Sequence, residues 1–162
     1  MKNMKIHYRQ ADLEKEADQK KVISLIRSFF ASMGEEDKFL PSWGQSMAEN
    51  LRKFPTTRAF LAEKEDKSIA LALCFLGFTT YENTPLLNLH DFVVLPEYRG
   101  QGVGTGFFAF LEDQARQMGC GRMTLEVNHT NPRAKKLYKE MGYTGSDLDK
   151  PQDRIYFLKK NF

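Results

Sequence analysis

The 162-residue chain is poor in the residues that mark several classes of protein. Its two cysteines, Cys74 and Cys120, are too few for a disulfide framework and indicate reduced thiols in a cytoplasmic protein. Its three histidines, His7, His90 and His129, lack the spacing of metal ligands. We therefore expect neither a disulfide-rich secreted domain nor a metal site.

Long hydrophobic runs are also missing. No segment approaches the roughly 20 apolar residues that span a membrane, and the first residues lack the apolar core of a secretion signal. A net charge of +3 is too small to indicate a nucleic-acid partner. The apolar content (41%) and charged content (28%) are those of an ordinary globular protein, so we expect a single domain over residues 1–162 with no nucleic-acid or membrane partner.

The most informative stretch is glycine-rich. The run Phe92–Leu95 predicts a buried strand, which Pro96 ends because proline cannot donate to a ladder. Four glycines alternate after it, and a helical pattern of apolar residues then begins. A strand, a glycine loop and a helix N-terminus together favour an anion site, since free N–H groups and the helix dipole point at the loop. The glycines are Gly100, Gly102, Gly104 and Gly106, and the apolar helix positions are Phe107, Phe108, Leu111, Ala115 and Met118.

Two common phosphate-loop patterns do not fit this stretch. A Walker loop needs a lysine after its last glycine, and here Thr105 follows directly. A dinucleotide loop needs G-x-G-x-x-G, which fails from both Gly100 and Gly102. Glu126 lies at about the distance of a ribose-binding acid, roughly 20 residues on, so a nucleotide-binding domain stays an alternative.

The pattern that does fit is Arg/Gln-x-x-Gly-x-Gly, found as Arg99-Gly100-Gln101-Gly102-Val103-Gly104. It resembles the pyrophosphate loop of the GNAT superfamily of acyl-CoA N-acyltransferases. A second stretch resembles the same family: a strand that ends near Val127, then Asn131, then a helix that carries Tyr138 before the pair Gly142-Tyr143. Asn131 and Pro132 also suit the N-cap and first position of that helix.

The order of the predicted elements indicates an α/β (α+β) protein. Short turns make most of the sheet antiparallel, and a helical connection makes one strand pair parallel. The resemblance implies a mixed, mostly antiparallel sheet of six to seven strands with a splayed parallel pair and about four helices. We expect strands at residues 5–10, 59–63, 69–80 (covered on both faces), 86–95, 122–127, from 143 and at 155–158, with a hairpin turn around 147–153. We expect helices at 11–32, 42–54, 104–118 and 131–141.

The resemblance implies that acyl-CoA lies between the strand ending near Val94 and the strand ending near Val127. Its pantetheine arm would pair with the first strand, and its pyrophosphate would bind the amides of the glycine loop. Asn131 would reach the pantetheine. The implied coenzyme-binding residues are Phe92, Val93, Val94, Arg99, Gly100, Gln101, Gly102, Val103, Gly104, Thr105 and Asn131.

Acetyl transfer to an amine needs a polarised thioester carbonyl, a proton donor for the departing thiolate and a neutral amine. A backbone N–H near Val94 would polarise the carbonyl. Tyr138 is the candidate general acid, since a phenol with a pKa of about 10 suits a thiolate. Where related enzymes carry Glu-Asp, this chain has His90-Asp91. The base is therefore His90, Asp91 or a water molecule.

The stretch from Phe78 to Gly100 looks most like diamine and polyamine (spermidine/spermine) N-acetyltransferases. The acidic run Glu35, Glu36 and Asp37 suits a cationic substrate, although taken alone such a charge run is more often simply a solvated surface segment. The leading hypothesis is acetyl-CoA-dependent N-acetylation of a small primary amine. A CoA-binding module without catalysis and an enzyme acting on a peptide or protein amine are the alternatives. Homodimers are common in such folds, but the sequence indicates no interface.

Overall fold

The computed structural model describes residues 5–145 and 155–162. These residues form two compact units. Unit 1 contains the described residues up to Cys74 together with Asp91–Val103, and unit 2 contains those of Phe75–His90 and Gly104–Phe162. Seven strands are described, in the sheet order β1-β2-β3-β4-β5-β7-β6. Strands β3 and β4 each begin in one unit and end in the other.

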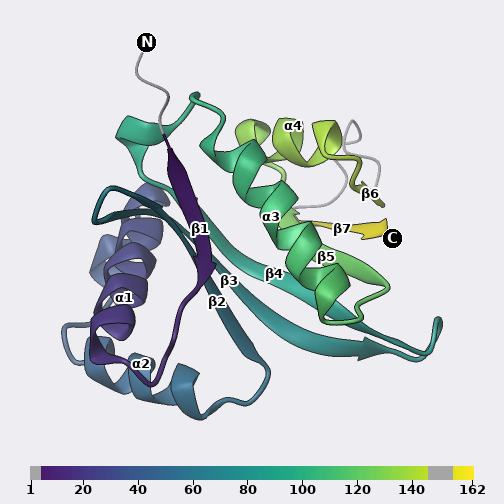
Figure 1. Ribbon diagram of the computed structural model, residues 1–162. Helices are drawn as coiled ribbons and strands as arrows, with labels where there is room; N and C mark the ends of the chain where they lie inside the picture. Colours follow the sequence, from purple (N-terminus) through teal and green to yellow (C-terminus); the bar gives the residue numbers. More distant parts are fainter. Residues whose placement is uncertain (1–4, 146–154) are drawn as a thin grey trace. The chain divides into compact units, whose positions relative to one another are not determined.

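Figure 1 labels the elements. The strands are β1 (Ile6–Gln10), β2 (Thr57–Lys64), β3 (Lys67–Thr79), β4 (Thr84–Val94), β5 (Arg122–Asn128), β6 (Thr144–Gly145) and β7 (Ile155–Asn161). The α-helices are α1 (Glu16–Ser32), α2 (Trp43–Lys53), α3 (Val103–Gln117) and α4 (Pro132–Glu140), with short 3-10 turns η1 (Glu36–Lys38) and η2 (Pro96–Tyr98). Pairs β1–β2, β5–β7 and β6–β7 are antiparallel, and β4–β5 is parallel. This mixed sheet with four α-helices confirms the expected fold class.

The parallel pair has a short register. It runs from Leu86↔Arg122 to Leu89↔Leu125, while β4 continues to Val94 and β5 to Asn128. On its other side β5 pairs with β7 along its whole length. The pairing of β6 with β7 confirms the expected closing strands, and the expected turn around 147–153 lies outside the described residues.

Unit 1 has its core around β2 and the first part of β3. Ala59–Ala62 and Ile69–Cys74 are buried without a break, so these segments are covered on both faces. Helix α1 buries Val22, Leu25 and Ile26 at helical spacing, as expected. Its predicted start at residue 11 is wrong. Residues 12–15 form a turn instead, with the N–H of Lys15 donating to the carbonyl of Asp12 at 2.9 Å, and the helix begins at Glu16.

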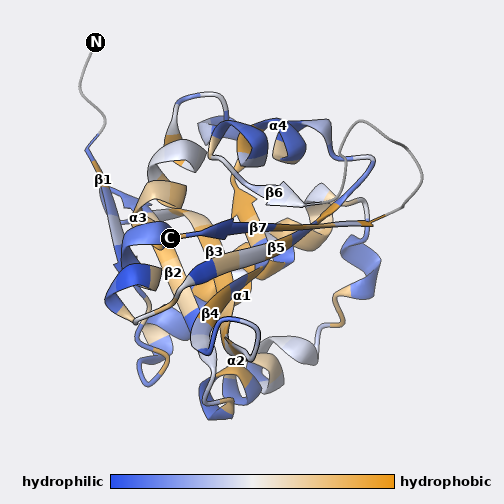
Figure 2. Ribbon diagram, turned by 90° about the vertical axis from the view of Figure 1, so that its right-hand side faces the viewer, coloured by the Kyte–Doolittle hydropathy of each residue, from blue (hydrophilic) through white to orange (hydrophobic). Residues whose placement is uncertain are grey.

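In unit 2 the sheet is covered on one face. On β7, buried Tyr156 and Leu158 alternate with exposed Ile155 and Phe157. Helix α3 buries the apolar face that its sequence predicts. The expectation that β3 is covered on both faces fails beyond Cys74, where the strand is half-buried or exposed, because an apolar run cannot show which face a helix covers. Figure 2 shows the hydrophobic residues of the central strands and the hydrophilic character of α4.

Neither a membrane-spanning helix nor a metal-binding group is found in the described part of the chain. No helix there is long and apolar enough to cross a membrane. No three or more His, Cys, Asp or Glu side chains there are grouped so that they could hold a metal ion.

Candidate functional site

The glycine loop joins the end of β4 to the start of α3. Gly100 and Gly102 have φ angles of 71° and 81°, a left-handed conformation that costs glycine little and other residues about 1 kcal/mol or more. A Cβ at either position would meet nothing within 4 Å, so backbone conformation rather than crowding requires glycine there. Gly104 and Gly106 lie inside α3. Two of the four glycines therefore shape the loop.

The backbone N–H groups of residues 100–102 are suited to binding an anion. No acceptor within the described residues takes a hydrogen bond from them. The long side chains beside them are tied back: Arg99 Nε donates to the carbonyl of Val94 at 2.7 Å, and Gln101 Nε2 to that of Glu97 at 2.7 Å. A row of unpaired donors ahead of a 15-residue helix fits a pyrophosphate group.

The other predicted coenzyme residues lie on three elements. Val93 of β4 is buried, and Phe92 and Val94 beside it are half-buried. Val103 begins α3 and is buried. Thr105 is exposed in the first turn of α3.

His90 and Asp91, the candidate bases, follow one another on β4. Successive residues of a strand point to opposite faces, so the two side chains serve different sides of the sheet. His90 is exposed, and its ring lies edge-on to that of Phe75, 5.4 Å between centroids. Asp91 is half-buried. The pKa of the Cys74 thiol is raised mainly by burial and, to a smaller extent, by the negative charge of Asp91.

Tyr138 lies in unit 2, in the second half of α4. Its side chain is 6% exposed and packs against the rings of Phe108 and Tyr143, at 5.3 and 6.3 Å between centroids. Burial raises the pKa of its phenol, so the hydroxyl stays protonated at neutral pH. No hydrogen bond involves this hydroxyl within the described residues, whereas Tyr143 Oη donates to Met123 Sδ at 3.4 Å.

Asn131 is the N-cap of α4, as the sequence predicts. Its Oδ1 accepts from the N–H of Ala134 at 3.1 Å, and Pro132 occupies the first helical position. The side chain is exposed, and its amide NH₂ is the part left to meet a ligand. Contact with pantetheine stays a prediction.

The acidic run lies in and before η1 of unit 1. Glu35 pairs with Lys38 at 2.6 Å, while Glu36 and Asp37 are exposed. One of the three carboxylates is therefore already neutralised, which weakens the attraction of this segment for a cation.

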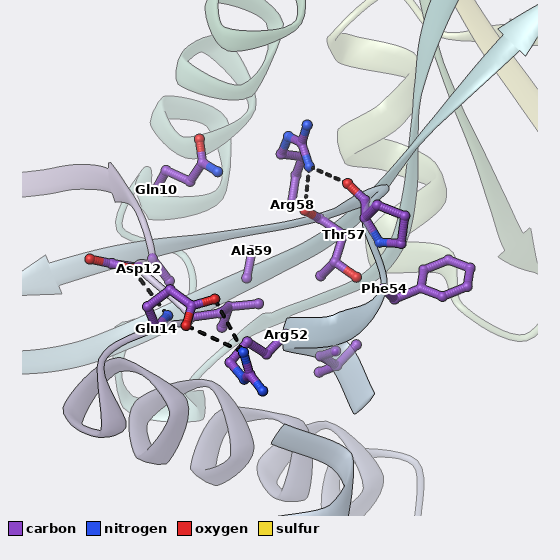
Figure 3. A pocket seen from close by; sticks show the side chains of 12 residues that line it. Gln10, Asp12, Glu14, Arg52, Phe54, Thr57, Arg58 and Ala59 are labelled. Carbon is purple, nitrogen blue, oxygen red and sulfur yellow. Dashed lines mark hydrogen bonds and ion pairs between the residues drawn. The ribbon is translucent and has the colours of Figure 1, made fainter. Parts of the chain in front are cut away.

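A pocket of about 420 Å³ lies in unit 1, between the segment that leads from β1 to α1 and the connection from α2 to β2 (Figure 3). Its charged side chains are engaged: Arg52 reaches Glu14 at 3.3 Å, and Arg58 Nη1 donates to the carbonyls of Pro55 and Thr57 at 3.0 and 2.7 Å. The residues predicted to bind coenzyme or substrate are absent from its lining.

The sequence interpretation missed a polar row on the open face of unit 2. Asn88 Nδ2 donates to Thr124 Oγ1 at 3.1 Å, and Glu126 and Asn128 follow at alternate positions of β5. The alternation of polar and apolar residues from 122 to 128 was the signal for this row.

Comparison with known proteins gives a family. The model of the acetyltransferase (GNAT) family matches residues 25–143. Thialysine N-epsilon-acetyltransferase of Bos taurus is 34% identical over 74 residues, 46% of this chain and 43% of that protein. Streptothricin acetyltransferase of Streptomyces lavendulae is 30% identical over 93 residues, 57% of this chain and 48% of that protein. The matched region thus spans less than half the length of these relatives.

Solved structures show the same fold. An aminoglycoside acetyltransferase from an uncultured soil metagenomic sample, in complex with sisomicin, has a TM-score of 0.76 at 18% identity, over 88% of this chain and 90% of that one. An aminoglycoside N-acetyltransferase in complex with CoA has a TM-score of 0.72 at 16% identity, again over 88% and 90%. Because the family model covers most of the chain and these structures share its fold, the chain belongs to the acetyltransferase (GNAT) family.

Proposed function

We propose that residues 1–162 form a single cytoplasmic acetyltransferase domain, which transfers an acetyl group from acetyl-CoA to a primary amine of a small molecule. The observation that carries this proposal is the row of unpaired N–H groups at residues 100–102, in a chain of the GNAT family. Acetyl-CoA supplies the thioester, and no metal takes part.

The coenzyme is bound by backbone more than by side chains. The amides of residues 100–105 hold the pyrophosphate, because they combine unpaired donors with the positive end of α3. The backbone of residues 92–94 pairs with the pantetheine arm, and an N–H near Val94 polarises the thioester carbonyl. The NH₂ group of Asn131 donates to the pantetheine.

Tyr138 protonates the departing thiolate. Burial raises the phenol pKa, which keeps the proton in place until a strong base arrives. The same dry surroundings raise the proton affinity of a thiolate, since both anions lose solvation there. Phenol and thiolate are thereby kept matched as donor and acceptor.

The base that accepts the proton of the amine is His90, directly or through water, with Asp91 as the alternative. His90 is exposed on β4, and an imidazole nitrogen can accept a proton. If His90 acts, His90→Gln lowers kcat/KM and changes its pH profile. An unchanged pH profile in this variant leaves Asp91 or water as the base.

The acceptor that we propose is a diamine or polyamine. The stretch from Phe78 to Gly100 supports this class, and relatives of this chain are named for the acetylation of thialysine, streptothricin and aminoalkylphosphonates. Two of these names, those of the thialysine and aminoalkylphosphonate enzymes, specify an N-acetyltransferase.

The test measures release of CoA thiol from acetyl-CoA with spermidine, putrescine, an aminoglycoside, free amino acids and a short peptide. Turnover on one amine class supports the proposed acetyltransferase activity. A preference for the peptide instead supports a peptide or protein amine as the acceptor. Thermal stabilisation by acetyl-CoA without any turnover supports a CoA-binding module. Absence of stabilisation overturns the coenzyme role of the glycine loop.

A further inference from the structure

We propose that the open face of β5 and β7 in unit 2 binds a second cationic group of the acceptor, with Glu126 as its anionic partner and Phe157 as its aromatic neighbour. This inference rests on the proposed function and names the residues that would hold the second charge of the acceptor. It assigns the acceptor to amines that carry at least two positive charges.

The register of the two strands brings these side chains together. Glu126 of β5 lies directly opposite Phe157 of β7, so both project from the same face. Glu126 is exposed, and Phe157 is 48% exposed. The next pair on this face is Asn128↔Ile155, with Ile155 62% exposed. A carboxylate beside apolar and aromatic surface is suited to an alkylammonium group, which gains both charge pairing and a cation–π contact.

Glu126 differs from the neighbouring carboxylate on this side of unit 2. Glu82 pairs with Arg122. The hydrogen bond to Arg122 is the main cause that lowers the pKa of Glu82, and the charge of Lys159 lowers it slightly further. Lys159 lies opposite Thr124, two positions along β5 from Glu126. Within the described residues no cation pairs with Glu126. Arg122 is thus engaged by Glu82, whereas the carboxylate of Glu126 has no ion-pair partner among the described residues.

The cation at Glu126 is a second group rather than the attacked nitrogen. The attacking amine must be neutral, and a carboxylate that holds it as an ammonium stabilises the unreactive form. His90 lies on this same face, because it is two residues from Asn88 on β4 and the Asn88 side chain bonds to Thr124. The proposed base and the proposed cation anchor therefore share one face of unit 2.

The experiment compares 1,4-diaminobutane with n-butylamine, which has the same chain and one charge fewer. Steady-state kinetics and calorimetric titration into the CoA-bound protein are measured for the wild type and Glu126→Gln. We expect Glu126→Gln to raise KM and Kd for the diamine about tenfold, the effect of losing one charge-assisted contact of about 1.4 kcal/mol. Values for butylamine and the KM of acetyl-CoA should change less than about twofold.

Two further variants separate charge from aromatic packing. Phe157→Leu should weaken diamine binding. Phe157→Tyr should retain the binding of the wild type, since phenylalanine and tyrosine both present an aromatic face to the cation. Asp113→Asn is the matched control. It removes an exposed carboxylate of α3, which pairs with Arg116, and should leave both amines unaffected.

The failures of the two proposals are distinguishable. If the diamine binds in a way that depends on Glu126 but is not acetylated, the cation site is supported and acetyl transfer to this amine is overturned. Turnover with equal KM for the diamine in wild type and Glu126→Gln keeps the enzyme and overturns the cation site. Absence of diamine binding by the wild type also overturns the site.

Discussion

Lys160 of β7 donates to Glu112 Oε1 of α3 at 2.7 Å and to the carbonyl of Met141, at the end of α4, at 2.7 Å. One ammonium group thus joins a strand and both helices of unit 2. The Glu112 side chain is 7% exposed, and its other cation, Arg116, lies 3.5 Å away.

Lys160→Met should lower the free energy of unfolding by about 3 kcal/mol, because it leaves a buried carboxylate with its weaker partner and removes a cap from α4. Urea denaturation measures this loss. Lys139→Met, an exposed lysine of α4, is the control and should stay within about 0.5 kcal/mol of the wild type. Equal stability of both variants would contradict the role of Lys160.

Acid should destabilise unit 1 through Arg9. Its guanidinium binds Asp18 at 2.7 Å and Glu63 at 2.8 Å, and these contacts lower the pKa of each carboxyl to about 2. Both folded pKa values lie below the unfolded ones, so this stabilisation is complete above about pH 5 and is lost as the pH falls towards about 2. Each carboxyl contributes on the order of 2–3 kcal/mol to the free energy of unfolding.

The measurement is unfolding free energy against pH for the wild type and Arg9→Met. The wild-type curve should fall between about pH 5 and pH 2, and the variant should be less stable at neutral pH with a flatter curve. Parallel curves would show that other carboxylates govern acid unfolding.

Gly102→Ala should weaken coenzyme binding with little effect on kcat. The new methyl group forces the loop out of its left-handed conformation and moves the N–H donors, so we expect KM for acetyl-CoA to rise about tenfold or more. Gly34→Ala is the matched control, since Gly34 has φ of 70° and open space around its Cβ but lies after α1. Both variants should lose about 1 kcal/mol of stability, and an equal KM in both would contradict the phosphate role of the loop.

Tyr138→Phe should lower kcat about 10²-fold or more while leaving KM for acetyl-CoA and stability nearly unchanged. The hydroxyl makes no hydrogen bond within the described residues, so its removal orphans no partner. Tyr143→Phe, which loses the hydrogen bond to Met123, should keep its kcat. Because burial raises the phenol pKa, the wild type should show no activity loss from Tyr138 ionisation below about pH 10.

The periodicity of apolar residues, together with the proline, glycine and N-cap residues that begin or end elements, predicted the elements of the fold. Pro96 and the glycines located the end of β4 and the start of α3, and the N-cap pair at Asn131 located α4. The parallel β4–β5 pair followed from its helical connection. The late start of α1 was missed, because the Asp12 side chain accepts from the N–H of Glu14 and Asp18 accepts from the N–H of Asp12, which holds a turn where a helix was expected.

The candidate site was predictable where backbone geometry specifies it. Gly100 and Gly102 adopt the conformation that only glycine favours, so their spacing already carried the signal. The cross-strand placements of Glu126 beside Phe157 and of Asn88 beside Thr124 depend on tertiary register. A single sequence does not encode register in a readable way, so these relationships emerged only from the structure.

The burial of Cys74 and Cys120 makes the folded chain unreactive toward thiol reagents. Both cysteines are buried and form no disulfide, and burial raises the pKa of Cys74, so little reactive thiolate forms there. Released CoA is then the thiol that a colorimetric reagent detects during turnover. The same two side chains become labelled when the chain opens, so pulse alkylation reports unfolding without an added probe.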